Sequence, residues 1–173
     1  MKVVFLDFDG PIIPILSHHK RKAAYEAGDK TPLAAWPACI AALNRITDTT
    51  GAVIVVSSTW RADGLMRTRE RLCSWGVKAD CIALTPYLDR KMENGLWEPV
   101  PRGLEIQKWL DDYERETVES FVIIDDDQDM EHLLPRLIHT PFEDGLTEAD
   151  ADRAIEMLQP PQSPGSGNGE SLS

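Results

Sequence analysis

Residues 3–10 read Val-Val-Phe-Leu-Asp-Phe-Asp-Gly, a short apolar run that ends abruptly in two aspartates and a glycine. The same pattern of an apolar run followed by polar residues occurs twice more. Residues 53–56 and 121–124 are also apolar and rich in β-branched side chains, and polar residues follow each of them. Continuous apolar runs of this length are typical of strands covered on both faces, as in a parallel sheet. We therefore expect strands at these three positions.

Stretches with a helical period lie between the apolar runs. Apolar residues three or four positions apart predict helices that end near Gly51 and near Gly76, and a further helix over residues 106–113. Thr147 followed by Asp150 is typical of a capped helix start. Strands that alternate with helices predict an α/β fold with a doubly wound, mostly parallel sheet.

The composition fits one folded domain. The chain has 173 residues, of which 42% are hydrophobic and 27% are charged, close to the averages for soluble globular proteins. Residues 159–173 are dominated by Pro, Gly, Ser and Gln, and bury too little apolar surface to offset the entropy of ordering. We expect a domain over residues 1–158 and a disordered tail over residues 159–173.

The net charge and the cysteines indicate which binding partners and which cellular compartment to expect. The net charge of −11 opposes sequence-independent attraction to nucleic-acid phosphates. The cluster His18–Lys22 has two interpretations, a local basic patch or an ordinary solvent-exposed face. Cys39, Cys73 and Cys81 form no C-x-x-C pair, so we expect reduced, half-buried packing residues. Because neither a secretory h-region nor an apolar run of bilayer length is present, we expect a cytoplasmic protein without membrane contact.

The residues just beyond the apolar runs carry the candidate chemistry. Ligands of parallel sheets bind outside the carboxyl ends of the strands, and these ends fall at residues 7–10, 57–61 and 125–129. If the strands are neighbours, at least four carboxylates meet beside hydroxyls in one crevice. Clustered carboxylates repel one another unless a cation neutralises them, and oxygen-only ligands favour Mg²⁺. One Asp-x-Asp-Gly alone is more often a turn, so the prediction depends on all three ends.

These strand ends resemble the motifs of the haloacid-dehalogenase-like (HAD) superfamily of aspartate-nucleophile phosphohydrolases. The third motif, normally a Lys that opens a helix, has Arg102 as its nearest match, with Lys108 as a second candidate deeper in the helix. The resemblance implies a Rossmann-like core, and the 47 residues between the first two motifs imply a minimal cap. The other matching residues are Asp7 and Asp9 for the first motif, Ser57 for the second, and Asp125 with Asp126 for the fourth.

Finer details resemble one subgroup, the HAD domain of Swiss Army Knife RNA repair proteins. They lie in residues 57–61, 84–86, 102–110 and 145–147. The chain departs from the superfamily at Pro11, where Thr or Val is usual, and in the Arg of the third motif. An Arg stays charged and grips phosphate with two N–H groups, so the electrostatic role survives.

The resemblance implies covalent phosphoryl transfer. Asp7 would attack phosphorus to form an aspartyl phosphate, while Asp9 would protonate the leaving oxygen and then deprotonate water. Asp129 would orient the water ligands of the metal or act only as a helix-start carboxylate. The implied phosphate-binding residues are Ser57, Ser58 and Arg102, and the implied Mg²⁺ ligands are Asp7, Asp9 through its main-chain carbonyl, and Asp125 or Asp126.

A minimal cap leaves an open site, which suits a bulky substrate such as a phosphorylated polynucleotide end. Arg61 is the expected substrate-binding residue, beside the cluster His18–Lys22. Trp36, Trp60 and Trp97 are candidates for stacking on a base, although tryptophan more often packs in a core.

Two alternatives remain at this point. A small-molecule phosphatase or nucleotidase would share the catalytic residues but need a closed pocket, which residues 87–101 could form. A non-catalytic phosphate-binding module is the other alternative, and the intact pair Asp7 and Asp9 counts against it. The sequence leaves the oligomeric state open.

Overall fold

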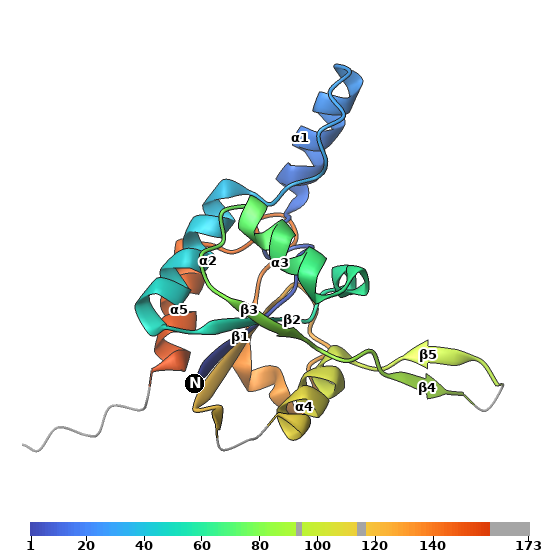
Figure 1. Ribbon diagram of the computed structural model, residues 1–173, viewed down its shortest axis with the longest axis vertical. Coiled ribbons are helices and arrows are strands. Elements are labelled where there is room, and N and C mark those ends of the chain that lie inside the picture. Colours follow the sequence, from blue (N-terminus) through green and yellow to red (C-terminus); the bar gives the residue numbers. More distant parts are fainter. Residues whose placement is uncertain (93–94, 114–116, 160–173) are drawn as a thin grey trace, which may run out of the picture.

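The centre of the molecule is a five-stranded parallel sheet. In the computed structural model, which describes residues 1–92, 95–113 and 117–159, the strand order is β3-β2-β1-β6-β7 (Figure 1). Every neighbouring pair is parallel, which confirms the predicted α/β fold. The bounds are β1 Lys2–Leu6, β2 Val53–Val56, β3 Cys81–Leu84, β6 Ser120–Asp125 and β7 Leu137–His139.

The three predicted strands are the central ones. Leu6 at the end of β1 lies opposite Val56 of β2 on one side and Ile124 of β6 on the other. The edge strands β3 and β7 were not predicted. Because the three central strands end level with one another, the residues that follow them share one edge of the sheet.

Helices cover both faces of the sheet. Val4 and Leu6 face a core with α2 (Pro37–Thr50), α3 (Leu65–Ser74) and α5 (Glu148–Leu158). Val3 and Phe5 face the opposite core, with α4 (Arg102–Asp112) and the short 3₁₀ helix η3 (Glu131–Arg136). This alternation follows from the two-residue period of a strand, so the sheet is doubly wound.

Three predicted helix boundaries agree with the structure, whereas the helix predicted over residues 106–113 begins at Arg102 and ends at Asp112. Helix α2 ends directly before Gly51, and α3 ends two residues before Gly76. At the start of α5, the Thr147 side chain accepts from the Asp150 N–H, and Asp150 accepts from the Thr147 N–H in return. This capping box satisfies N–H groups that a helix start leaves without partners.

Two elements project from this body in Figure 1. Helix α1 (Ile15–Glu26) and the segment after it form the insert between β1 and α2, in line with a minimal cap. The strands β4 (Asp89–Lys91) and β5 (Trp97–Pro99) form an antiparallel hairpin within the predicted loop 87–101.

The remaining expectations concern the cysteines, the C-terminal tail and membrane contact. The prediction of half-buried cysteines was wrong for all three, because Cys39 and Cys81 are buried and Cys73 is exposed on α3. The predicted tail lies outside the described residues except for Gln159. Among the helices described, none has the length and apolar character needed to cross a bilayer.

Candidate active site

The carboxyl ends of β1, β2 and β6 bring the three motifs together. The Asp7 N–H donates to the carbonyl of Ile124 at 3.0 Å, and the Ser57 N–H donates to the carbonyl of Leu6 at 3.0 Å. Both bonds continue the parallel ladder by one residue. Asp7, Ser57 and Asp125 are therefore held side by side at one edge of the sheet.

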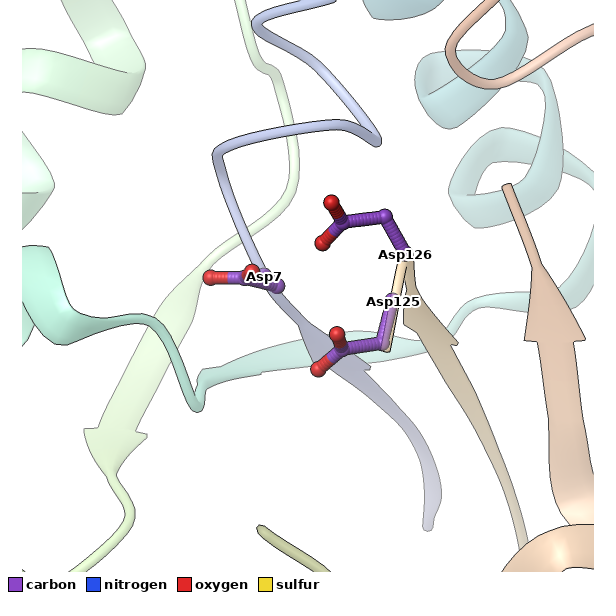
Figure 2. A group of neighbouring side chains, drawn as sticks. All are labelled: Asp7, Asp125 and Asp126. Carbon is purple, nitrogen blue, oxygen red and sulfur yellow. The ribbon is translucent and has the colours of Figure 1, made fainter. Parts of the chain in front are cut away.

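Three carboxylates converge there. One oxygen from each of Asp7, Asp125 and Asp126 lies within 4.8 Å of the others, and Figure 2 shows the side chains facing a common space. Asp7 is 6% exposed and Asp125 is fully buried. We call these three residues the acidic cluster. In the described chain, Asp7 Oδ1 and Asp125 Oδ2 have no hydrogen-bond partner, as expected for oxygens arranged to hold a cation.

Burial and mutual repulsion disfavour the ionised forms in the metal-free chain. Burial, followed by the charge of Asp7, raises the pKa of Asp125 to about 8. The same two causes raise the pKa of Asp126 to about 6. Burial also raises the pKa of Asp7, against the opposing effects of Arg102 and of the Ser58 hydroxyl. A bound divalent cation would remove this repulsion.

Gly10 lets the chain turn tightly beside the acidic cluster. Its φ of 84° is one that residues with a side chain rarely adopt. A Cβ atom at this position would lie 2.5 Å from the Cβ of Asp126. The glycine after the two aspartates therefore makes room for the fourth motif.

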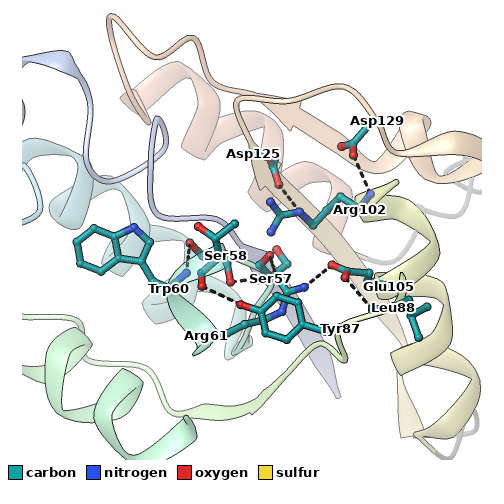
Figure 3. Close-up of polar contacts among 11 residues, drawn as sticks. Ser57, Ser58, Trp60, Arg61, Tyr87, Leu88, Arg102, Glu105, Asp125 and Asp129 are labelled. Carbon is teal, nitrogen blue, oxygen red and sulfur yellow. Dashed lines mark hydrogen bonds and ion pairs between the residues drawn. The ribbon is translucent and has the colours of Figure 1, made fainter. Parts of the chain in front are cut away.

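Arg102 supplies positive charge from the first turn of α4. Its Nε lies 4.0 Å from Asp125 Oδ2, and its backbone N–H donates to Asp129 at 2.8 Å (Figure 3). Its buried Nη1 has no hydrogen-bond partner among the described residues. Burial alone would lower the pKa of Arg102, but the carboxylates around it, Asp7 first, outweigh burial and raise it.

Lys108, the other candidate for the third motif, lies elsewhere. Its ammonium pairs with Asp112 one turn further along α4, and its side chain is 48% exposed. Of the two candidates, Arg102 is the one beside the acidic cluster. Asp129 accepts the Arg102 backbone N–H, as expected of a helix-start carboxylate.

The two serines after β2 are fully buried. The Ser57 hydroxyl has no partner among the described residues. The Ser58 hydroxyl accepts the Trp60 N–H at 3.3 Å and opens a 3₁₀ turn, η1 (Thr59–Asp63). A buried hydroxyl without a partner beside the cluster is available to a ligand oxygen.

Arg61 does not face solvent as a substrate-binding residue would, which corrects the prediction made for it. Its residue is only 4% exposed, and Nη2 pairs with Glu105 of α4 at 2.5 Å. Nη1 donates to the carbonyls of Ser57 and Ser58, and the guanidinium lies 3.8 Å from the ring centroid of Tyr87 (Figure 3). Arg61 instead supports the loop that carries the two serines.

Glu105 was not predicted from the sequence as a residue of the site. It accepts the Leu88 N–H at 3.1 Å as well as pairing with Arg61, so it joins three segments around the site. A signal was present, because Glu105 precedes Trp109 by four positions and so falls on the apolar face of its helix. A carboxylate on that face requires a buried partner.

Asp9 lies beside the cluster and is partly exposed. Its Oδ2 accepts the indole N–H of Trp60 at 2.8 Å, and its charge contributes to the raised pKa of Asp7 and of Asp126. Trp36 is half-buried, and the side chain of Trp97 is outside the described residues.

The parallel sheet, wound on both faces and carrying an acidic cluster at its carboxyl edge, defines a Rossmann-like HAD core. A family model described as the HAD domain in Swiss Army Knife RNA repair proteins matches residues 3–151. The chain belongs to this family, and its fold and family support a HAD-type phosphohydrolase. Comparison with curated proteins found no match, and neither did comparison with solved structures.

Proposed function

We propose that this chain is a Mg²⁺-dependent phosphomonoester hydrolase that works through an aspartyl phosphate on Asp7. One observation carries the proposal. At the carboxyl edge of the sheet, two buried acceptors, Asp7 Oδ1 and Asp125 Oδ2, have no hydrogen-bond donor among the described residues, and two buried donors, Ser57 Oγ and Arg102 Nη1, have no acceptor there. A phosphate ester together with a divalent cation would satisfy both sets.

The chain's own residues account for each step. A carboxylate oxygen of Asp7 attacks phosphorus while Asp9 gives a proton to the leaving oxygen. Ser57, Ser58 and Arg102 bind the equatorial phosphoryl oxygens as their charge redistributes. Asp9 then takes a proton from a water molecule that attacks phosphorus, the bond between Asp7 and phosphorus breaks, and phosphate leaves with Asp7 restored.

The acidic cluster fits a magnesium ion because all its donors are oxygens and two of them lack partners. Asp7, Asp125 and Asp126 would hold the ion, with the main-chain carbonyl of Asp9. When bound, the ion would offset the repulsion between the Asp7 carboxylate and the anionic ester.

A nitrophenyl phosphate assay with Mg²⁺ and with a chelator tests this function. We expect chelation to abolish turnover and Asp125→Asn to raise the Mg²⁺ concentration needed for activity. Asp127→Asn is the matched control, because Asp127 is an exposed neighbour outside the acidic cluster. Equal rates with and without chelator would refute the metal assignment.

For the substrate, we propose a phosphorylated polynucleotide end, reached in a reducing, cytoplasmic setting in keeping with the free cysteines. A groove of about 320 Å³ beside α1 supports this choice, since Lys20, Arg21 and Trp36 line it. The Lys20 ammonium lies 5.8 Å from the Trp36 ring centroid. Cations beside an aromatic face suit the phosphates and bases of a single strand.

A small-molecule phosphatase is the second candidate. A hollow of about 490 Å³ under the β4–β5 hairpin is lined by Tyr87, Arg90 and Arg102, and it offers a place for a compact leaving group. Its three arginines, Arg61, Arg90 and Arg102, are balanced by Glu98, Glu105 and Asp129, so the lining favours a polar leaving group without a net charge.

Paired charge reversals separate the two substrates. Arg21→Glu should lower turnover of a phosphorylated oligonucleotide and leave turnover of nitrophenyl phosphate unchanged. Turnover of the oligonucleotide should depend more steeply on salt concentration in the unsubstituted protein than in this variant. Lys22→Glu makes the same charge change on the same helix outside the groove and should have a smaller effect. Higher kcat/KM for a mononucleotide or sugar phosphate than for any oligonucleotide end would favour the second candidate.

A further inference from the structure

The carboxylate of Asp9 is held by a residue that the mechanism above does not use. The indole Nε1–H of Trp60 donates to Asp9 Oδ2 at 2.8 Å. The other oxygen, Oδ1, lies 3.9 Å from Nε2 of His18, which is too long for a hydrogen bond. Oδ2 of Asp9 is therefore held by a hydrogen bond from Trp60, whereas Oδ1 is too far from His18 to be held by one.

The ring of Trp60 is itself fixed on several sides. Its centroid lies 6.1 Å from those of Phe8 and Trp75, in edge-on contacts. The guanidinium of Arg71 lies 4.8 Å from the same ring, and the Trp60 backbone N–H is bound to the Ser58 hydroxyl. A ring packed in this way has little rotamer freedom, so its N–H keeps one direction.

We propose that Trp60 is a positioning residue that orients the Asp9 carboxyl for proton transfer. The proposal rests on the proposed phosphatase function and deepens it. An indole N–H can only donate, so the oxygen it contacts must keep a lone pair toward it. In the protonated carboxyl the carbonyl oxygen is the stronger acceptor, so the contact with Trp60 at Oδ2 favours the form with the proton on Oδ1.

One orientation serves both halves of the reaction. In the first half, an Asp7 oxygen bonds to phosphorus, the bond from phosphorus to the leaving oxygen breaks, and the Oδ1 proton of Asp9 moves to that oxygen. In the second half, water attacks phosphorus, the bond from Asp7 to phosphorus breaks, and a water proton moves to Oδ1. The carboxyl need not rotate between the two transfers.

The leaving group provides the test, because substrates differ in their need for this proton. Nitrophenolate departs readily without protonation, whereas an alkoxide does not. Loss of a positioning residue should therefore impair an alkyl phosphate much more than nitrophenyl phosphate. A merely structural defect would impair both substrates alike.

Trp60→Phe and Trp75→Phe form a matched pair, because both shorten an indole in the same aromatic cluster and only Trp60 binds Asp9. We expect Trp60→Phe to reduce kcat/KM for the alkyl phosphate roughly tenfold more than for nitrophenyl phosphate, a part of the full effect of a general acid. Trp75→Phe should leave the ratio of the two substrates unchanged.

Equal loss on both substrates in Trp60→Phe, or no loss, would overturn the positioning role. Absence of turnover in the unsubstituted protein would refute the proposed function instead. If circular dichroism shows that Trp60→Phe does not fold, benzothienylalanine at this position keeps the bicyclic shape and replaces the N–H by sulfur. The same selective loss is then expected, and an unchanged substrate ratio would contradict the proposal.

Discussion

Single residues at the carboxyl edge of the sheet are placed at a cost to stability. Asp7 and Asp125 are buried next to each other, and the charge of Asp7 raises the pKa of both Asp125 and Asp126. Arg102 offsets only part of this repulsion, since its Nε is 4.0 Å from Asp125 Oδ2. Such an arrangement is typical of a site built for a ligand rather than for stability.

Asp7→Asn should raise the melting temperature of the chelated protein, because it removes one buried charge and keeps the shape of the side chain. The same variant should have no phosphatase activity, since an amide is a poor nucleophile. Thermal denaturation and a nitrophenyl phosphate assay on one preparation measure both effects. A lower melting temperature would show that Asp7 is ionised and well stabilised without metal.

The sequence predicted some of these residues and missed others for a physical reason. Asp7, Ser57 and Asp125 directly follow apolar strands, so the parallel sheet itself dictates that they meet. Arg61 lies five residues beyond β2, within the 3₁₀ turn η1, and that turn directs it inward to Glu105. Local pattern does not encode the direction of a side chain in such a turn.

At the scale of elements, the first turn of α4 organises one wall of the site. It carries both Arg102, beside the acidic cluster, and Glu105, paired with Arg61. The edge strands β3 and β7 escaped prediction because each contains a single β-branched residue, Ile82 and Ile138. By contrast, β2 is no longer than β3 but consists of four β-branched residues.

Glu105→Gln should destabilise the protein by about 3 kcal/mol, because it leaves the Arg61 guanidinium buried without its counter-charge. Urea denaturation measures the change. Asp112→Asn is the control on the same helix, since its exposed pair with Lys108 should contribute less than about 1 kcal/mol. Similar losses in the two variants would mean that the Arg61–Glu105 pair is not effectively buried.

Gly103→Ala should displace the start of α4, because the new Cβ would lie 2.2 Å from the carbonyl oxygen of Met130. We expect a loss of about 1–3 kcal/mol by urea denaturation, as for other overpacked sites. Arg102 should move with the helix, so kcat/KM should also fall. Unchanged stability would show that the segment around Met130 yields easily.

At the scale of the whole molecule, the acidic cluster should make stability depend on pH. The folded-state pKa values of Asp125 and Asp126, about 8 and about 6, lie above the ordinary 3.8, so the folded chain binds these protons more tightly than the unfolded chain. Their contribution is complete below about pH 3.8 and is lost as pH rises through about 6 and about 8.

Mg²⁺ should therefore raise the melting temperature more near pH 8 than near pH 5. Only at the higher pH do the carboxylates need the ion to remain together, and protons compete with it at the lower pH. Scanning calorimetry with Mg²⁺ and with chelator at both pH values checks this. An equal shift at both pH values would contradict the raised pKa values.

In the proposed mechanism, Asp7 carries the phosphoryl group during turnover. The most direct measurement is mass spectrometry of the protein after brief reaction with an aryl phosphate and an acid quench. We expect one added phosphoryl group on the peptide that contains Asp7, and none in Asp7→Asn. Rapid turnover that leaves Asp7 unmodified, or undiminished activity in Asp7→Asn, would contradict this mechanism.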